Sequence, residues 1–197
     1  FSRGSKIPGL SPTTGHPVTQ YITPIEGGDA LGNFRAQQLL PRLQAVSDKI
    51  SGISARFVHL VDTLVPLSAE QLQQWQALLT YGEPYEGETA GALVVVTPRI
   101  GTVSPWASKA TDIARNCGLT VHRVERLIEY RIALKPGLLG GKPALTPEQR
   151  WAVASLLHDR MTEAVVATRD EAHALFTELH AAPMERVDVL GGGRAAL

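Results

Sequence analysis

Apolar residues at helical spacing, together with residues typical of helix starts, predict four helices in this chain. Ser68 and Thr146 are typical N-cap residues, and Pro147 follows at a first helical position. Asp29 is expected to cap the first helix, and Pro41 is expected to bend or interrupt it. The predicted helices cover residues 29 to about 47, 68–82, 104–118 and 146–161, and a further short helix is expected over residues 167–179.

The strands are predicted from apolar runs and from weak alternation of apolar and polar residues. Residues 92–96 form an uninterrupted apolar run typical of a buried strand, which Pro98 stops. Pro24 restricts the weakly alternating residues 21–27 to an edge strand. No internal repeat is visible in the sequence, and the mixture of elements predicts an α+β fold. The remaining predicted extended segments are residues 53–63, residues 121–134 as a long strand or hairpin arm, and residues 184–190.

Composition narrows the class of protein. The chain has 197 residues, of which 44% are hydrophobic, enough for one real core. Its net charge of +0 and its low aromatic content of 6% argue against nucleic acid and membrane surfaces as partners. No apolar stretch approaches the roughly 20 residues that span a bilayer. Because Cys117 is the single cysteine, no internal disulfide can form, which favours a reducing, cytoplasmic setting.

The segment TPRIGTVSPWASKATDIARNCG, residues 97–118, carries more hydroxyl and charged groups than a strand-to-helix turn requires. Ser104 is the expected N-cap, Pro105 the first helical residue and Gly118 the residue just beyond the helix. The expected buried stripe consists of Trp106, Ala110, Ile113, Ala114 and Cys117. The expected residues of the other faces are Ser108, Lys109, Asp112, Arg115 and Asn116.

Two interpretations of this segment stay open from its residues alone. In the first, the hydroxyls cap the helix, Trp106 packs and the charges are solvated. In the second, the free N–H groups of the helix start act together with Arg99 and Lys109 to hold an anion or the carboxylate of a partner surface.

The sequence offers no assembled catalytic or metal-binding set. Its six histidines include no HExxH pattern, and no Ser-His-Asp or paired-carboxylate arrangement can be built from spacing. We therefore expect no metal site, and we expect Cys117 to be a small core residue and not a nucleophile. Two glycine-rich segments, residues 137–143 and 187–196, only superficially resemble phosphate-binding and dinucleotide-binding loops. From its residues, the chain is predicted to be an α+β domain that has no catalytic activity by itself.

Three segments carry a resemblance to a known family: residues 97–119, VERLIEYRI at 124–132 and LHDRMTEAV at 157–165. Together with GGDALGNFRAQQLLPRLQ at 27–44, they closely resemble the N-terminal domain of the large, single-chain phosphoribosylformylglycinamidine synthase. The resemblance covers about residues 21–197.

The resemblance implies a place in purine biosynthesis. The full enzyme of that family converts formylglycinamide ribonucleotide, ATP and glutamine to formylglycinamidine ribonucleotide, ADP, phosphate and glutamate. A synthetase domain binds ATP and magnesium, and a glutaminase domain makes ammonia; neither lies in this chain, so no cofactor is expected here. The implied fold is α+β, a mainly antiparallel sheet with helices packed on it, resembling a fused dimer of the small subunit of the split enzyme.

The resemblance also implies a domain division and a role. Residues 1–20 are expected to be a flexible tail, residues 21–183 a docking domain, and residues 184–197 the start of a linker to the synthetase domain. The partners implied are the synthetase and glutaminase domains of the same polypeptide. The rival interpretation is a freestanding regulatory or small-ligand-binding module, and an independent enzyme is a third.

The predicted interface lies on the helix start of residues 99–109. Arg99 and Lys109 would supply charge, Thr102 and Ser104 hydrogen bonds, and Trp106 an anchor. The other candidates are Ser108 and, more weakly, Asp112, Asn116 and Arg126.

Overall fold

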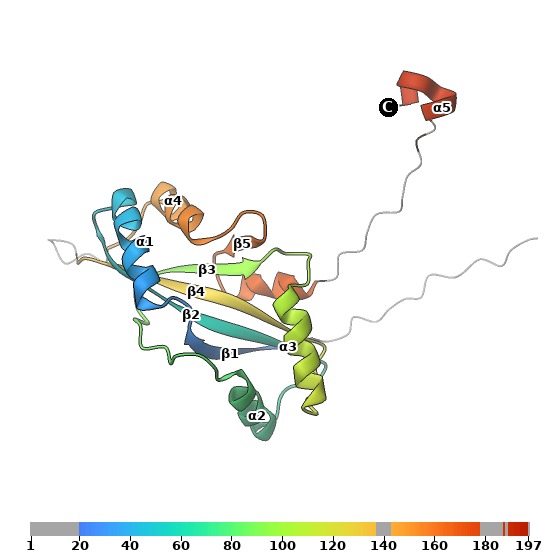
Figure 1. Cartoon of the computed structure of the whole chain (residues 1–197), viewed down its shortest axis with the longest axis horizontal. Coiled ribbons are helices and arrows are strands. Elements are labelled where there is room, and N and C mark those ends of the chain that lie inside the picture. Colours follow the sequence, from blue (N-terminus) through green and yellow to red (C-terminus); the bar gives the residue numbers. More distant parts are fainter. Residues whose placement is uncertain (1–19, 137–142, 178–186, 188, 197) are drawn as a thin grey trace, which may run out of the picture.

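The computed structural model describes residues 20–136, 143–177, 187 and 189–196. Its sheet has five strands in the order β1-β2-β4-β3-β5, and each neighbouring pair is antiparallel (Figure 1). The expected α+β class with an antiparallel sheet is therefore confirmed. The strands are β1 (Tyr21–Asp29), β2 (Ile50–Thr63), β3 (Ala92–Pro98), β4 (Arg123–Leu134) and β5 (Glu163–Val166).

Helix starts follow the predicted capping residues in three cases. Ser68 and Thr146 each form a reciprocal capping box with the glutamine three residues later, and Ser104 caps the helix that begins at Pro105. The helices are α1 (Asn33–Val46), α2 (Ala69–Leu79), α3 (Pro105–Asn116), α4 (Pro147–Leu157) and α5 (Val189–Gly192), with 3-10 helices η1 (Asp170–Phe176) and η2 (Gly193–Ala196). None of the helices in the described part of the chain has the length and apolar content to cross a membrane.

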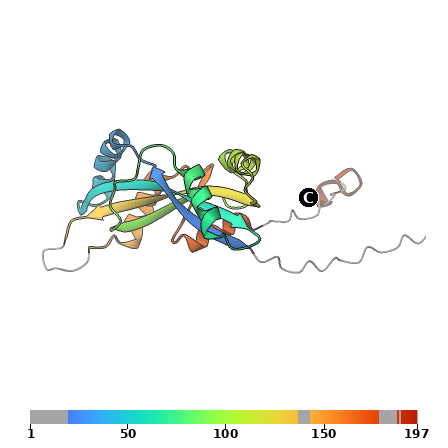
Figure 2. The ribbon, with the colours of Figure 1, turned by 90° about the horizontal axis from the view of Figure 1, so that it is seen from below.

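Three hydrophobic clusters hold the helices against the sheet. The first joins α1 and α4 to one end of the sheet, around Leu43 and Tyr130. The second joins α2 and α3 to strands near the other end, around Trp75 and Val124. The third lies on the opposite face, where η1 packs on Leu127. Figure 2 shows α1 and α3 on one side of the sheet and η1 on the other.

The elements follow a repeated order. The unit β1-α1-β2-α2 is succeeded by β3-α3-β4-α4, and β5 pairs with β3 at the edge. The second strands of the two units, β2 and β4, pair with each other in the middle of the sheet over almost their whole length. The first strands, β1 and β3, lie outside them.

The predicted start of the first helix is wrong. Asp29 is the last residue of β1, and its Oδ1 accepts a hydrogen bond from the Leu31 N–H at 3.1 Å, which forms a turn before the helix. Gly32 occupies the N-cap position without a side-chain bond. Pro41 lies inside the helix, which continues to Val46, so the proline does not interrupt it.

The C-terminal predictions are partly wrong. Of the helix predicted over residues 167–179, the structure has a 3-10 helix, η1, and residues 178–179 lie outside the described part. Of the extended segment predicted over residues 184–190, residues 184–186 and 188 also lie outside it. Val189 and Leu190 begin the short helix α5 and are not extended.

Candidate functional site

The start of α3 is fixed by one serine hydroxyl with two partners. Ser104 Oγ accepts from the Ala107 N–H at 3.0 Å, which caps the helix. The same oxygen donates to Oε2 of Glu125 on β4 at 3.1 Å. This double role ties the helix start to the central part of the sheet and orients the loop that precedes it.

Glu125 is a fully buried carboxylate behind this helix start. Burial raises its pKa, while the Arg123 charge and the Ser104 hydrogen bond act in the other direction. Arg123 Nε lies 3.6 Å from Oε1, which has no hydrogen-bond partner among the described residues. Ser104 therefore supplies hydrogen bonds to this carboxylate from its hydroxyl and from its backbone.

The buried face of α3 differs from the predicted stripe. The buried residues are Ala107, Thr111 and Ala114, and the Thr111 hydroxyl accepts from the Val124 N–H at 3.0 Å. These small residues let the helix approach β4, where β3 no longer pairs with it. Ile113 is 45% exposed. Cys117 is exposed, so the prediction that it is a core residue is wrong.

Most of the polar candidates point to solvent. Arg99, Thr102, Ser108, Lys109, Asp112 and Asn116 are exposed, and Ser104, Trp106 and Arg126 are half-buried. Thr102 Oγ1 donates to the Arg99 carbonyl at 2.7 Å, which stabilises the turn before the helix. Within the described residues, neither Arg99 nor Lys109 forms an ion pair. The two cations therefore remain available to a partner.

Trp106 and Arg126 belong to an aromatic cluster whose other members the sequence did not single out as site residues. The guanidinium carbon of Arg126 lies 4.7 Å from the Trp106 ring centroid and 4.2 Å from that of Phe57. Its Nη1 donates to the Tyr81 hydroxyl at 3.1 Å, and that oxygen lies 2.8 Å from His59 Nε2. Phe57, His59 and Tyr81 come from β2 and the loop after α2, so no local pattern joins them to residues 97–118.

His59 is the buried member of this aromatic cluster. Burial, and after it the Arg126 charge, lowers the pKa of its imidazole to about 4, against a weaker opposing effect of the Ile25 carbonyl. The ring is therefore neutral at pH 7. Gly27 of β1 leaves room for it, because a Cβ on Gly27 would lie 2.6 Å from His59 Cε1.

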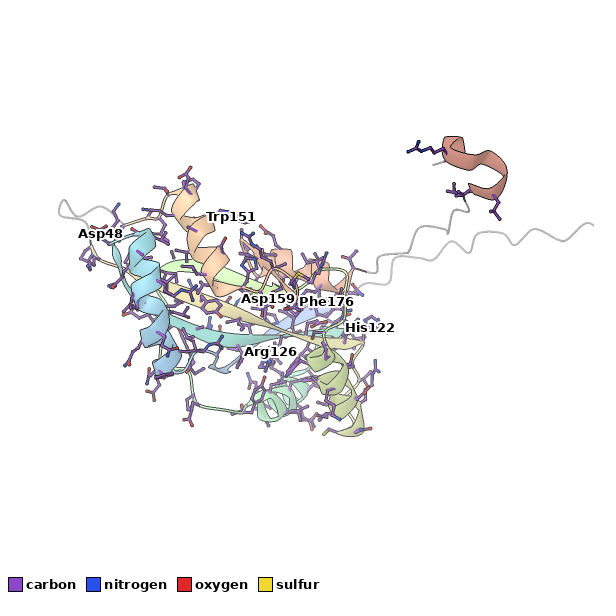
Figure 3. The ribbon with its side chains drawn as sticks, turned by 45° about the horizontal axis from the view of Figure 1, so that its top comes forward. Asp48, His122, Arg126, Trp151, Asp159 and Phe176 are labelled. Carbon is purple, nitrogen blue, oxygen red and sulfur yellow. The ribbon has the colours of Figure 1, made fainter. Side chains whose placement is uncertain are left out.

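A groove of about 230 Å³ opens beside this cluster. Arg126 and Ile128 line it from β4, Trp106 from α3 and Glu163 from β5. Figure 3 places Arg126 over the middle of the sheet, between α1 and α3. Among the residues that the structure describes, no group of three or more His, Cys, Asp or Glu side chains could hold a metal ion.

Removing the Ser104 hydroxyl is expected to destabilise the protein by about 2 kcal/mol, since Ser104→Ala loses an N-cap and the side-chain hydrogen bond to buried Glu125. Ser68→Ala is the matched control, because Ser68 caps α2 at an exposed site and its hydroxyl binds no carboxylate among the described residues. It should cost about 1 kcal/mol. Urea unfolding of both variants measures the difference, and equal losses would contradict the role of the Glu125 contact.

A comparison with family models decides the family. The model described as formylglycinamide ribonucleotide amidotransferase N-terminal matches residues 56–176, more than half of the chain. The chain belongs to this family. It is thereby an N-terminal domain of phosphoribosylformylglycinamidine synthase, a ligase of purine biosynthesis. The matched region begins in β2 and ends with η1. It therefore contains α3, its candidate residues and the aromatic cluster.

Proposed function

We propose that this chain is the docking part of the ATP- and glutamine-dependent synthase, which converts formylglycinamide ribonucleotide to formylglycinamidine ribonucleotide. It packs on the synthetase domain of the same polypeptide and is not catalytic alone. ATP, magnesium and glutamine act in the synthetase and glutaminase domains, and the enzyme works in the cytoplasm. The family match supports the identity of the enzyme.

The observation that carries the docking role is the outward-facing start of α3. Arg99 and Lys109 are exposed and form no ion pair within the described residues. Ser104 fixes the helix start from behind, so the loop is a pre-ordered surface. A pre-ordered surface with free cations fits a protein partner whose carboxylates complement it.

The double variant Arg99→Ala/Lys109→Ala in the complete synthase tests this role. Because rim charges contribute up to about 1 kcal/mol each, we expect a roughly three- to tenfold lower glutamine-dependent rate. The rate with free ammonia should change less, since ammonia bypasses the coupling of the two centres. Steady-state assays with glutamine and with ammonium salts measure both rates.

The control is Arg42→Ala/Lys49→Ala, which removes two exposed cations from α1 and from the turn before β2. It should leave both rates unchanged. An unchanged glutamine-dependent rate and unchanged coupling in the Arg99/Lys109 variant would contradict the docking role.

The alternative is a freestanding module that uses the same helix start to hold a small phosphate or carboxylate. The free N–H groups and positive end of α3 favour such a ligand. Isothermal titration of the 197-residue chain with formylglycinamide ribonucleotide, glutamine and ATP separates the two. Stoichiometric, tight binding supports the module, and absence of heat supports docking.

We further propose that the domain corresponds to a fused dimer of the small subunit of the split enzyme. The repeated order of elements supports this, because β1-α1-β2-α2 and β3-α3-β4-α4 meet through antiparallel β2 and β4. In a symmetric dimer the equivalent strands would pair across the two-fold axis in the same way.

A further inference from the structure

Arg126 is held in place by groups that leave its charge uncompensated. Its guanidinium contacts the Phe57 and Trp106 rings and donates once to Tyr81. Within the described part of the chain it forms no ion pair. A guanidinium carries five N–H donors, so most of them remain for a partner. The rings and the hydroxyl restrict its rotamers, which lowers the entropic cost of binding one.

The groove beside Arg126 has the size for a side chain and not for a nucleotide. Its volume is about 230 Å³, below the roughly 300–1,000 Å³ of sites for drug-sized ligands. The apolar walls include Val96 and Ile128. Glu163 also lines the groove, and its Oε2 accepts from the Asp159 N–H at 2.8 Å, which fixes the carboxylate but does not neutralise it. Within the described residues Arg126 forms no ion pair with Glu163, so the guanidinium still lacks a carboxylate partner.

The two loops that border the groove expose apolar side chains. Ile100 is 39% exposed, Val103 is 53% exposed and Met161 is 77% exposed. A backbone hydrogen bond from Arg99 N–H to the Thr162 carbonyl, at 3.0 Å, joins these loops. An apolar rim around a guanidinium without an ion-pair partner is the surface expected for a protein segment, since a small free anion gains nothing from the rim.

We propose that this groove receives an aspartate or glutamate side chain from a segment of the synthetase domain, and that Arg126 binds its carboxylate. The planar guanidinium can donate two parallel hydrogen bonds to a carboxylate. The apolar rim then excludes water around the pair. This inference rests on the proposed docking role and adds the chemistry of the partner residue.

A lysine at position 126 makes the contact chemically traceable in the complete synthase. Carbodiimide joins an amine to a carboxylate that it touches, so Arg126→Lys should give a cross-link from position 126 to an acidic residue outside residues 1–197. Peptide mass spectrometry identifies the pair. A cross-link only to Glu163 or Glu125, or none from position 126, overturns the inference.

Cross-links from Lys109 in the same sample show whether a missing link from position 126 refutes the carboxylate site alone or also the docking role. Links from Lys109 to the synthetase domain without a link from position 126 leave docking intact and refute the carboxylate site. Absence of links from both positions counts against both proposals.

Binding affinity gives a second measurement that does not depend on the lysine. Arg126→Met keeps the stem and removes the charge, and the 197-residue chain carrying it should bind the remainder of the synthase at least tenfold more weakly. The matched control is Arg131→Met, because Arg131 points to the opposite face of β4. Equal affinities of the two variants refute the site. Saturable binding of glutamate or inorganic phosphate by the chain, abolished in Arg126→Met, would assign the groove to a free anion.

Discussion

Replacing Glu129 by alanine is expected to lower the free energy of unfolding by about 3–5 kcal/mol, because it leaves two arginines without their buried partner. Glu129 is 1% exposed on β4 and accepts hydrogen bonds from Arg56 and Arg169. Arg56 comes from β2, and Arg169 immediately precedes η1. Both arginines also reach Glu26 of β1. The Glu129 carboxylate therefore joins the sheet to the start of η1, which covers the face of the sheet opposite to α1 and α3.

Glu26→Ala is the matched control for Glu129→Ala. Glu26 pairs with the same two arginines, but its side chain is 56% exposed, so its loss should cost less than about 1 kcal/mol. Urea unfolding at pH 7 compares the two variants. A loss below about 1 kcal/mol for Glu129→Ala would show that the arginines find other partners.

The pH dependence of this ion network has a defined sign. Burial raises the pKa of Glu129, but the hydrogen bonds and charges of Arg169 and Arg56 outweigh it, so the net pKa lies below the ordinary value of 4.5. A carboxyl with a lowered folded-state pKa stabilises the fold above its unfolded-state pKa. This contribution is lost as the pH falls below about 4.5. Glu125 acts oppositely, since its pKa is raised.

Local patterns were sufficient where neighbouring residues decide the structure. The three predicted caps and the edge position of β1 follow from single residues: Ser68, Ser104, Thr146 and Pro24. The same reasoning failed at Asp29, whose carboxylate closes a turn instead of capping α1. Capping a helix and closing a turn both use a carboxylate that accepts a hydrogen bond from a nearby N–H. Only the tertiary position of β1 decides between them.

The candidate site was predictable only on the side of α3. Residues 97–118 are contiguous, so their polar excess is visible in the sequence. The aromatic cluster is not, since Phe57 and Tyr81 reach Arg126 through β2 and the loop after α2. His59 is visible in the sequence as a histidine between Val58 and Leu60, but nothing in the sequence connects it to residues 97–118. Its neighbour Tyr81 carries no such signal.

His59 is expected to make the protein progressively less stable between pH 6.5 and pH 4. Its pKa falls from 6.5 in the unfolded chain to about 4 in the fold, chiefly through burial. Because the folded-state pKa is lowered, the neutral ring stabilises the fold fully above pH 6.5. As the pH falls to 4, the unfolded chain takes up a proton that the folded protein does not, which costs about 3 kcal/mol.

His59→Gln removes this titration and should flatten the fall in unfolding free energy over that pH range, as measured by urea unfolding at half-unit pH intervals. Tyr81→Phe is the informative control, because it deletes the hydrogen bond to His59 Nε2 but leaves the ring buried. It should lower stability by about 1 kcal/mol at every pH and keep the wild-type slope. If His59→Gln kept the full wild-type slope, the fall in stability would come from other groups, and burial would not lower the pKa of this imidazole.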